Sequence, residues 1–178
     1  MTVFLSDNII SGLGFTAEEN FLNVKQGKCG LKFFADRYDI PEPFMASEID
    51  DKQLEEAFEK VVTEVSVVGK HPLDGINYTK LEKASIVSVA GALKNTAIDP
   101  ADKRVLFILS TTKGNVFLVD ENECAGYEDD RIYLWRSAEL IAGFFGNPNQ
   151  PLIVSNACIS GASAMIAAQR ELRSGRYD

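Results

Sequence analysis

Residues 151–165, PLIVSNACISGASAM, predict a buried strand that turns sharply into a helix. Residues 151–155 are apolar enough for a covered strand, and residues 160–172 have the spacing of a helix. Cys158 stands at the turn, where a helix N-terminus leaves backbone N–H groups unpaired and favours negative charge. Such a place favours the thiolate of a cysteine, which is its nucleophilic form. We therefore take Cys158 as the candidate catalytic residue.

Two observations weigh against a reactive Cys158. A free cysteine before an alanine-rich helix can simply be a small residue of the core. A cysteine nucleophile also needs a base, and the only histidine of the chain, His71, lies far away in the sequence beside Pro72. The local pattern alone therefore leaves a buried, inert thiol open as the alternative.

The composition narrows the class of protein. The 178 residues suffice for one domain with a core, and the net charge of −8 disfavours nucleic acid and anionic membranes as partners. The three cysteines, Cys29, Cys124 and Cys158, lack the spacing of a metal site and favour a reducing, cytoplasmic compartment. We expect no signal peptide and no transmembrane segment.

Helical and strand patterns alternate along the chain, which predicts an α/β fold with a mostly parallel sheet. Capping boxes at Thr16–Glu19 and Thr79–Glu82 mark the beginnings of two helices. Residues 11–14 are expected to form a turn, and residues 28–50 to be irregular. Strands are expected over 2–10, 104–110 and 151–155, and helices over 17–26, 51–66, 80–95, 133–145 and 160–172.

Five short motifs follow one another along nearly the whole chain. They are NIISGLG at 8–14, ENF with GKCGL at 19–31, STTKG at 110–114, NACISG at 156–161, and the helix from 166 that ends in RSGRYD at 178. In this order and spacing they resemble motifs of the β-ketoacyl synthases, the condensing enzymes of fatty-acid and polyketide synthesis. Ser110 and Asn156 stand where that family commonly has Gly and Thr, which suggests a divergent branch.

The resemblance implies a thiolase-like α/β/α layered fold, with residues 1–178 as the N-terminal half of the family's domain. Complete members are about twice this length, and their C-terminal half carries the remaining catalytic residues. The resemblance also implies that Cys158 accepts an acyl group from the phosphopantetheine of an acyl carrier protein. No metal or organic cofactor is then expected, and residues 1–178 alone are expected to be inactive in condensation.

The expected partners are an acyl carrier protein and either a second copy of the chain or the missing C-terminal half, with no nucleic acid and no membrane. Two other classes remain as alternatives. One is a non-catalytic partner subunit similar to the chain-length factors, which typically lack the cysteine. The other is a thiolase-fold acyltransferase of a different branch. The residues around Cys158 do not distinguish such an enzyme from a ketosynthase.

Overall fold

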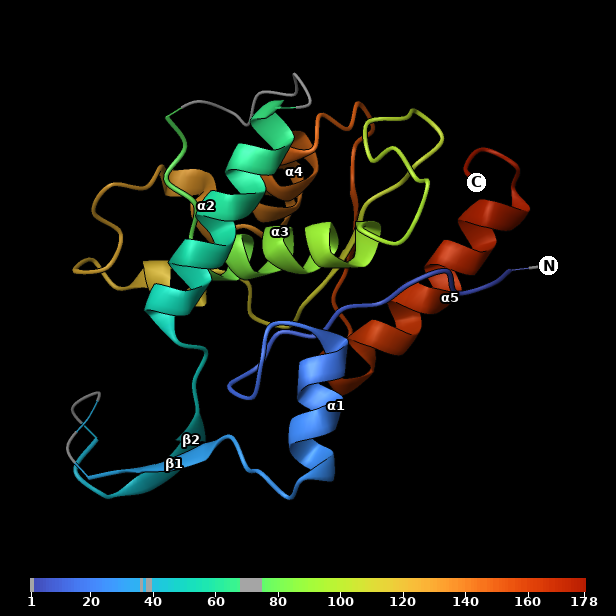
Figure 1. Ribbon diagram of the computed structural model, residues 1–178. Coiled ribbons are helices and arrows are strands. Elements are labelled where there is room, and N and C mark those ends of the chain that lie inside the picture. The colour runs from blue at the N-terminus through green and yellow to red at the C-terminus, as the bar shows by residue number, and fades with distance from the viewer. Residues whose placement is uncertain (1, 36, 38–39, 68–74) are drawn as a thin grey trace.

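The computed structural model describes residues 2–35, 37, 40–67 and 75–178, and has a mixed α/β fold (Figure 1). The α-helices of these residues are α1 (Ala17–Lys25), α2 (Asp51–Val67), α3 (Lys80–Leu93), α4 (Leu134–Phe144) and α5 (Ser160–Arg173). The strands are β1 (Leu31–Phe34), β2 (Phe44–Ser47), β3 (Ile108–Ser110) and β4 (Leu152–Val154). Short 3-10 helices cover η1 (Val116–Val119), η2 (Asp129–Ile132) and η3 (Ala157–Ile159).

The helices begin where the sequence predicts. In both capping boxes the threonine side chain accepts a hydrogen bond from the glutamate N–H, at 3.1 Å for Thr16 and 3.3 Å for Thr79. The amphipathic pattern that predicts α2 places Leu54 and Phe58 in the core. All five predicted helices are present, and their ends differ from expectation by one or two residues.

In place of the mostly parallel sheet expected from the sequence, the described residues form one parallel pair, β3–β4, and one antiparallel pair, β1–β2. Ile108 pairs with Leu152, and Ser110 with Val154. Both strands are shorter than the expected ranges 104–110 and 151–155. Before β3, the Val105 carbonyl accepts from the side chains of Asn147 and Asn149, and the Arg104 carbonyl accepts from the Asp178 N–H. Helix α4 contacts β4, and α5 contacts both strands.

The strand expected over residues 2–10 is not formed. The Asn8 side chain anchors this segment instead, donating to the Phe15 carbonyl at 3.1 Å and to the Ser88 hydroxyl at 3.3 Å. It approaches α3 at Gly91, where any added Cβ would lie 2.9 Å from the Asn8 side chain. These side-chain bonds fix the segment without a strand partner, and Phe4 remains exposed.

The region 28–50, expected to be irregular, contains the antiparallel hairpin β1–β2. Phe33 pairs with Met45 and Phe34 with Phe44, whose rings stack at 5.5 Å. Cross-strand aromatic pairs stabilise such a hairpin even when it has little else to pack on. Pro41 and Pro43, which argued against structure, fall between the strands and at the edge of β2.

The core lies between α2, α3 and α4. Phe58, Tyr78 and Phe144 form an aromatic cluster with ring centroids 5.5–5.8 Å apart, and Ile86 and Leu140 fill the space around it. Figure 1 shows α2 and α3 crossing in front of α4, while the β1–β2 hairpin extends away from this body. Within the described ranges, every helix is too short or too polar to cross a membrane.

Candidate functional site

The parallel pair β3–β4 places two of the predicted motifs at one edge of the sheet. The loop 111–114 leaves the carboxyl end of β3, and the turn with Cys158 leaves the carboxyl end of β4. Because Ser110 and Val154 are register partners, both loops start at the same level. Ligand sites of parallel sheets commonly form at such an edge.

The turn at Cys158 is backed by a left-handed residue. Ala157 has a φ of 46°, the only positive φ of a residue other than glycine among the described residues. This conformation costs an alanine about 1 kcal/mol or more, and it persists only where the surroundings hold it. It lets the chain turn from the end of β4 at Val154, through η3, to the start of α5 at Ser160.

Ser160 holds this turn closed. Its hydroxyl accepts a hydrogen bond from the Asn156 N–H at 2.8 Å and donates to the Ala157 carbonyl at 2.7 Å. The Asn156 amide in turn donates to the Ser163 hydroxyl at 3.1 Å. Ser160 is itself buried, so its hydroxyl acts as an internal clamp across the strained residue.

The thiol of Cys158 is exposed, which overturns the alternative of a buried core cysteine. No described residue accepts a hydrogen bond from the Cys158 backbone N–H. A free backbone N–H beside a nucleophile can donate to the oxyanion of a tetrahedral intermediate. The arrangement thus offers a nucleophile and one oxyanion donor on the same residue.

The other two cysteines are also exposed and lie outside this site. The Cys124 thiol donates to the Glu121 carbonyl at 3.3 Å, in a loop that also carries Glu123 and Glu128. The Cys29 sulfur accepts from the Leu31 N–H at 3.5 Å, ahead of β1. Neither stands at the start of a helix that follows a strand.

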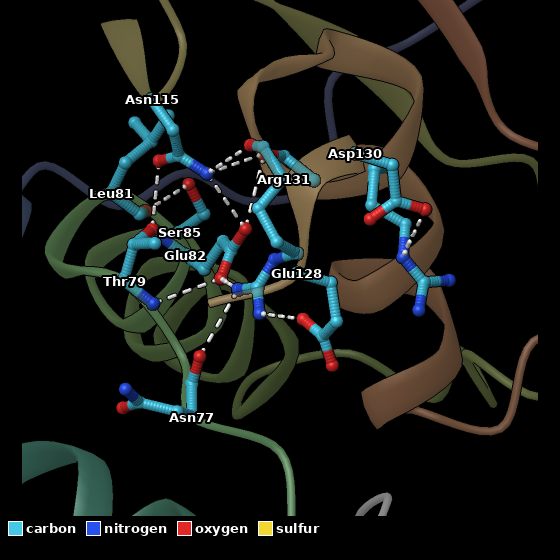
Figure 2. A network of polar contacts seen from close by, with 11 residues as sticks. Asn77, Thr79, Leu81, Glu82, Ser85, Asn115, Glu128, Asp130 and Arg131 are labelled. Atoms are coloured by element: carbon cyan, nitrogen blue, oxygen red, sulfur yellow. Dashed lines mark hydrogen bonds and ion pairs between the residues drawn. The ribbon is translucent and has the colours of Figure 1, made fainter. Parts of the chain in front are cut away.

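A buried polar cluster begins at Asn115, the residue that directly follows the loop 111–114 (Figure 2). Glu82 of α3 and Arg131 of η2 form an ion pair, and both side chains are at most 1% exposed. The Asn115 amide donates to the Glu82 carboxylate at 3.0 Å, to the Arg131 carbonyl at 3.1 Å and to the Ser137 hydroxyl at 2.9 Å. The Thr79 hydroxyl donates to the Asn115 carbonyl oxygen at 2.8 Å. We call these five residues the Glu82–Arg131 network.

The network governs the electrostatics around it. Burial, and then the Glu82 carboxylate, raise the pKa of Tyr78 to about 12, while Arg131 lowers it in part. The hydrogen bond from the Glu128 backbone, and then that from Arg131, hold the pKa of the exposed Glu128 carboxyl below its ordinary value. Within the network itself, the Glu82 carboxylate is paired with Arg131 and also accepts from the Asn115 amide and the Ser137 hydroxyl.

The network fixes the loop that faces Cys158 across the sheet edge. Asn115 follows directly on Gly114, whose φ of 58° favours glycine and where an added Cβ would clash with the Leu134 side chain. The Thr111 hydroxyl accepts from the Gly114 N–H at 3.2 Å. The network therefore positions the backbone of the loop 111–114 without reaching the thiol itself.

Sequence reasoning located Cys158 and the capping role of Glu82, but missed the network and the Ser160 clamp. A capping-box glutamate is ordinarily solvated, whereas Glu82 is buried and paired with Arg131 of η2. The described ranges contain no group of three or more His, Cys, Asp or Glu side chains that could hold a metal ion. His71 lies outside the described residues.

Comparison with protein-family models and with curated proteins yields no match for this chain.

Proposed function

We propose that this chain is the N-terminal half of a cytoplasmic condensing enzyme of the β-ketoacyl synthase class, with a thiolase-like layered fold. The observation that carries the proposal is the exposed Cys158 thiol at a clamped turn from strand to helix, with its own N–H unpaired among the residues that the structure describes. A thiol in an acyl-transfer enzyme needs this access and this donor. The strained Ala157 and the resemblance of the five motifs support the same assignment.

The chemical step proposed for Cys158 is transthioesterification. The thiolate sulfur attacks the carbonyl carbon of an acyl thioester on an acyl carrier protein, and the oxyanion accepts a hydrogen bond from the Cys158 N–H. The carbon–sulfur bond to phosphopantetheine then breaks, and the released thiolate takes up the proton that Cys158 lost. Decarboxylation of a malonyl thioester and attack on the acyl-cysteine require further groups, which we assign to a C-terminal half.

Unpaired strand edges support a partner chain. Within the described ranges β3 and β4 pair only with each other, so each leaves one edge without a backbone partner. Open edges readily accept another strand. We propose that β4 pairs with a second copy or with the C-terminal half.

The test of the acyl-transfer step is incubation of the chain with an acyl thioester of an acyl carrier protein, followed by mass spectrometry. We expect one acyl group on Cys158, its loss in Cys158→Ser, and its retention in a Cys29→Ser/Cys124→Ser variant that leaves Cys158 as the sole thiol. Acylation at Cys29 or Cys124 at the same rate would contradict the proposal. With malonyl thioester added, residues 1–178 alone should give no β-ketoacyl product.

A further inference from the structure

Two surfaces of this chain are complementary in charge, and both expose apolar side chains. The first lies on α1 and the β1–β2 hairpin and is called the lysine surface here. Residues 20–35 contain three lysines and no acidic residue, although the chain has a net charge of −8. Lys25, Lys28 and Lys32 are exposed, and none forms an ion pair with a described residue.

Exposed apolar side chains lie on the same helix and hairpin as the lysines, with Lys32 on the opposite face of β1 from Phe33. Phe33 and Met45 are a cross-strand pair on one face of the hairpin and are 66% and 56% exposed. Phe21 and Val24 of α1 are similarly exposed, and the Lys25 ammonium lies 5.9 Å from the Phe21 ring. Exposed apolar groups rimmed by like charges are typical of an interaction surface.

The second surface, called the acidic surface here, lies on η1 and the segment that leads into η2. Residues 120–130 contain six acidic residues and no lysine or arginine. Glu121, Glu123 and Asp129 are exposed and form no ion pair with any residue that the structure describes. Val116 and Val119 of η1 are exposed beside them, Val119 by 69%.

Within one copy of the chain, the lysine surface and the acidic surface lie on different parts of the molecule. In Figure 1 the hairpin extends below α2, away from the body, whereas η1 and the segment after it lie beside α3 and α4. Among the described residues, the charges on these two surfaces therefore have no ion-pair partner within one copy. Complementary potentials around apolar contacts are what specific protein interfaces use.

We propose that the lysine surface of one copy binds the acidic surface of a second copy of this chain. The two surfaces differ, so the contact is head-to-tail and builds rings or chains of copies. It is distinct from pairing through β4 and does not depend on the chemistry of Cys158. The apolar residues supply the buried area, and the charges set which surface meets which.

The test exchanges the charges of the two surfaces and measures association by sedimentation equilibrium. Lys25→Glu/Lys28→Glu/Lys32→Glu alone, and Glu121→Lys/Glu123→Lys/Asp129→Lys alone, should each associate roughly tenfold to hundredfold more weakly than the parent chain. An equimolar mixture of the two variants should recover association, since each surface again meets its opposite. Phe33→Ser should also weaken association while leaving every charge in place.

The matched control is Lys60→Glu/Lys103→Glu/Arg170→Glu, which changes the net charge equally at exposed cations elsewhere. It should associate at least as strongly as the mixture. A parent chain that stays monomeric, a control that weakens as much as the lysine variant, or a mixture that fails to recover would each overturn the proposal. So would a monomeric chain that binds an acidic amphipathic peptide or phosphatidylglycerol vesicles through the same lysines, because the partner is then another protein or a membrane.

Discussion

The Glu82–Arg131 network and the turn at Cys158 differ in how their polar groups are paired. Every charged group of the network finds its main partner inside the chain, and the ion pair is at most 1% exposed. Cys158 is exposed, and its N–H has no partner among the described residues. The first region makes most of its hydrogen bonds within the chain, with the Arg131 Nε as a buried atom that has no partner among the described residues, whereas the second keeps an exposed thiol and a backbone N–H for another molecule. A polar residue with few internal partners at a sheet edge is therefore the better candidate for chemistry than the most elaborate polar cluster.

Breaking the network should have the largest effect on stability. Arg131→Met leaves the Glu82 carboxylate buried without its counter-charge, and we expect a loss of about 3–5 kcal/mol in the free energy of unfolding. Urea denaturation followed by circular dichroism measures this loss. Arg136→Met is the matched control, because Arg136 is partly exposed and its ion pairs with Asp130 and Glu139 are longer, at 3.4 and 3.5 Å; its loss should stay below about 1 kcal/mol.

A double variant sharpens the same point. Glu82→Gln/Arg131→Met removes both charges and keeps a side chain that can complete the capping box at Thr79. It should be more stable than Arg131→Met alone, since no unpaired charge remains buried. Equal stability of the single and double variants would mean that packing, and not charge, holds this region.

The second prediction concerns alkaline pH. Because the pKa of Tyr78 is raised to about 12, its ring keeps the proton in the folded state while the unfolded chain loses it near pH 10. Between these values the unfolded state binds fewer protons, so the Tyr78 contribution to stability, complete below pH 10, is lost as pH rises to about 12.

Tyr78→Phe should remove this part of the pH dependence. The hydroxyl has no hydrogen-bond partner among the described residues, and the ring contacts with Phe58 and Phe144 remain, so stability at pH 7 should hardly change. Urea unfolding at pH 7, 10 and 11 provides the measurement. Tyr133→Phe, at an exposed ring, should keep the parent pH dependence; if it loses as much, the effect does not come from Tyr78.

The sequence predicts the local elements well and their long-range partners poorly. Capping boxes and apolar spacing locate α1 to α5, because those signals lie within a few residues of one another. Residues 2–10 have strand-forming side chains, but the strand needs a neighbour, and the bonds of Asn8 to Phe15 and Ser88 replace it. The hairpin over 28–50 was missed because its stability comes from cross-strand pairs, which periodicity does not reveal.

The candidate site was predictable in part for the same reason. Cys158 is marked by its position between a strand and a helix, which is local information. The pairing of Ser110 with Val154, which brings the loop 111–114 to the same edge, depends on the parallel register. The burial of Glu82 depends on η2, from nearly fifty residues later in the chain, and the capping box alone carries no sign of it.

The third prediction tests the strain at the turn. Ala157→Gly removes the left-handed penalty but adds entropy to the unfolded chain, and we expect stability to stay the same or rise by up to about 1 kcal/mol. Ala167→Gly, inside α5, has no strain to relieve and should cost about 1 kcal/mol. Urea unfolding measures the free energy of unfolding of both variants. Strain at Ala157 predicts that Ala157→Gly is more stable than Ala167→Gly. A loss at Ala157 as large as that at Ala167 would show that φ at this turn is not strained in the folded chain.

The smallest effect on stability is expected where the effect on chemistry is largest. Cys158→Ser changes one exposed atom that packs on nothing buried, so the free energy of unfolding should change by less than about 0.5 kcal/mol. The same variant should lose the acyl group that mass spectrometry detects on the parent chain, since a serine hydroxyl without a base is a far weaker nucleophile than a thiolate. Ser160→Ala provides the contrast: it removes the clamp on Asn156 and Ala157, so it should lower stability by about 1 kcal/mol and slow acylation while leaving the thiol intact. If Cys158→Ser destabilises the chain as much as Ser160→Ala does, Cys158 contributes to the fold, and the separation between a satisfied network and an unsatisfied site fails at this residue.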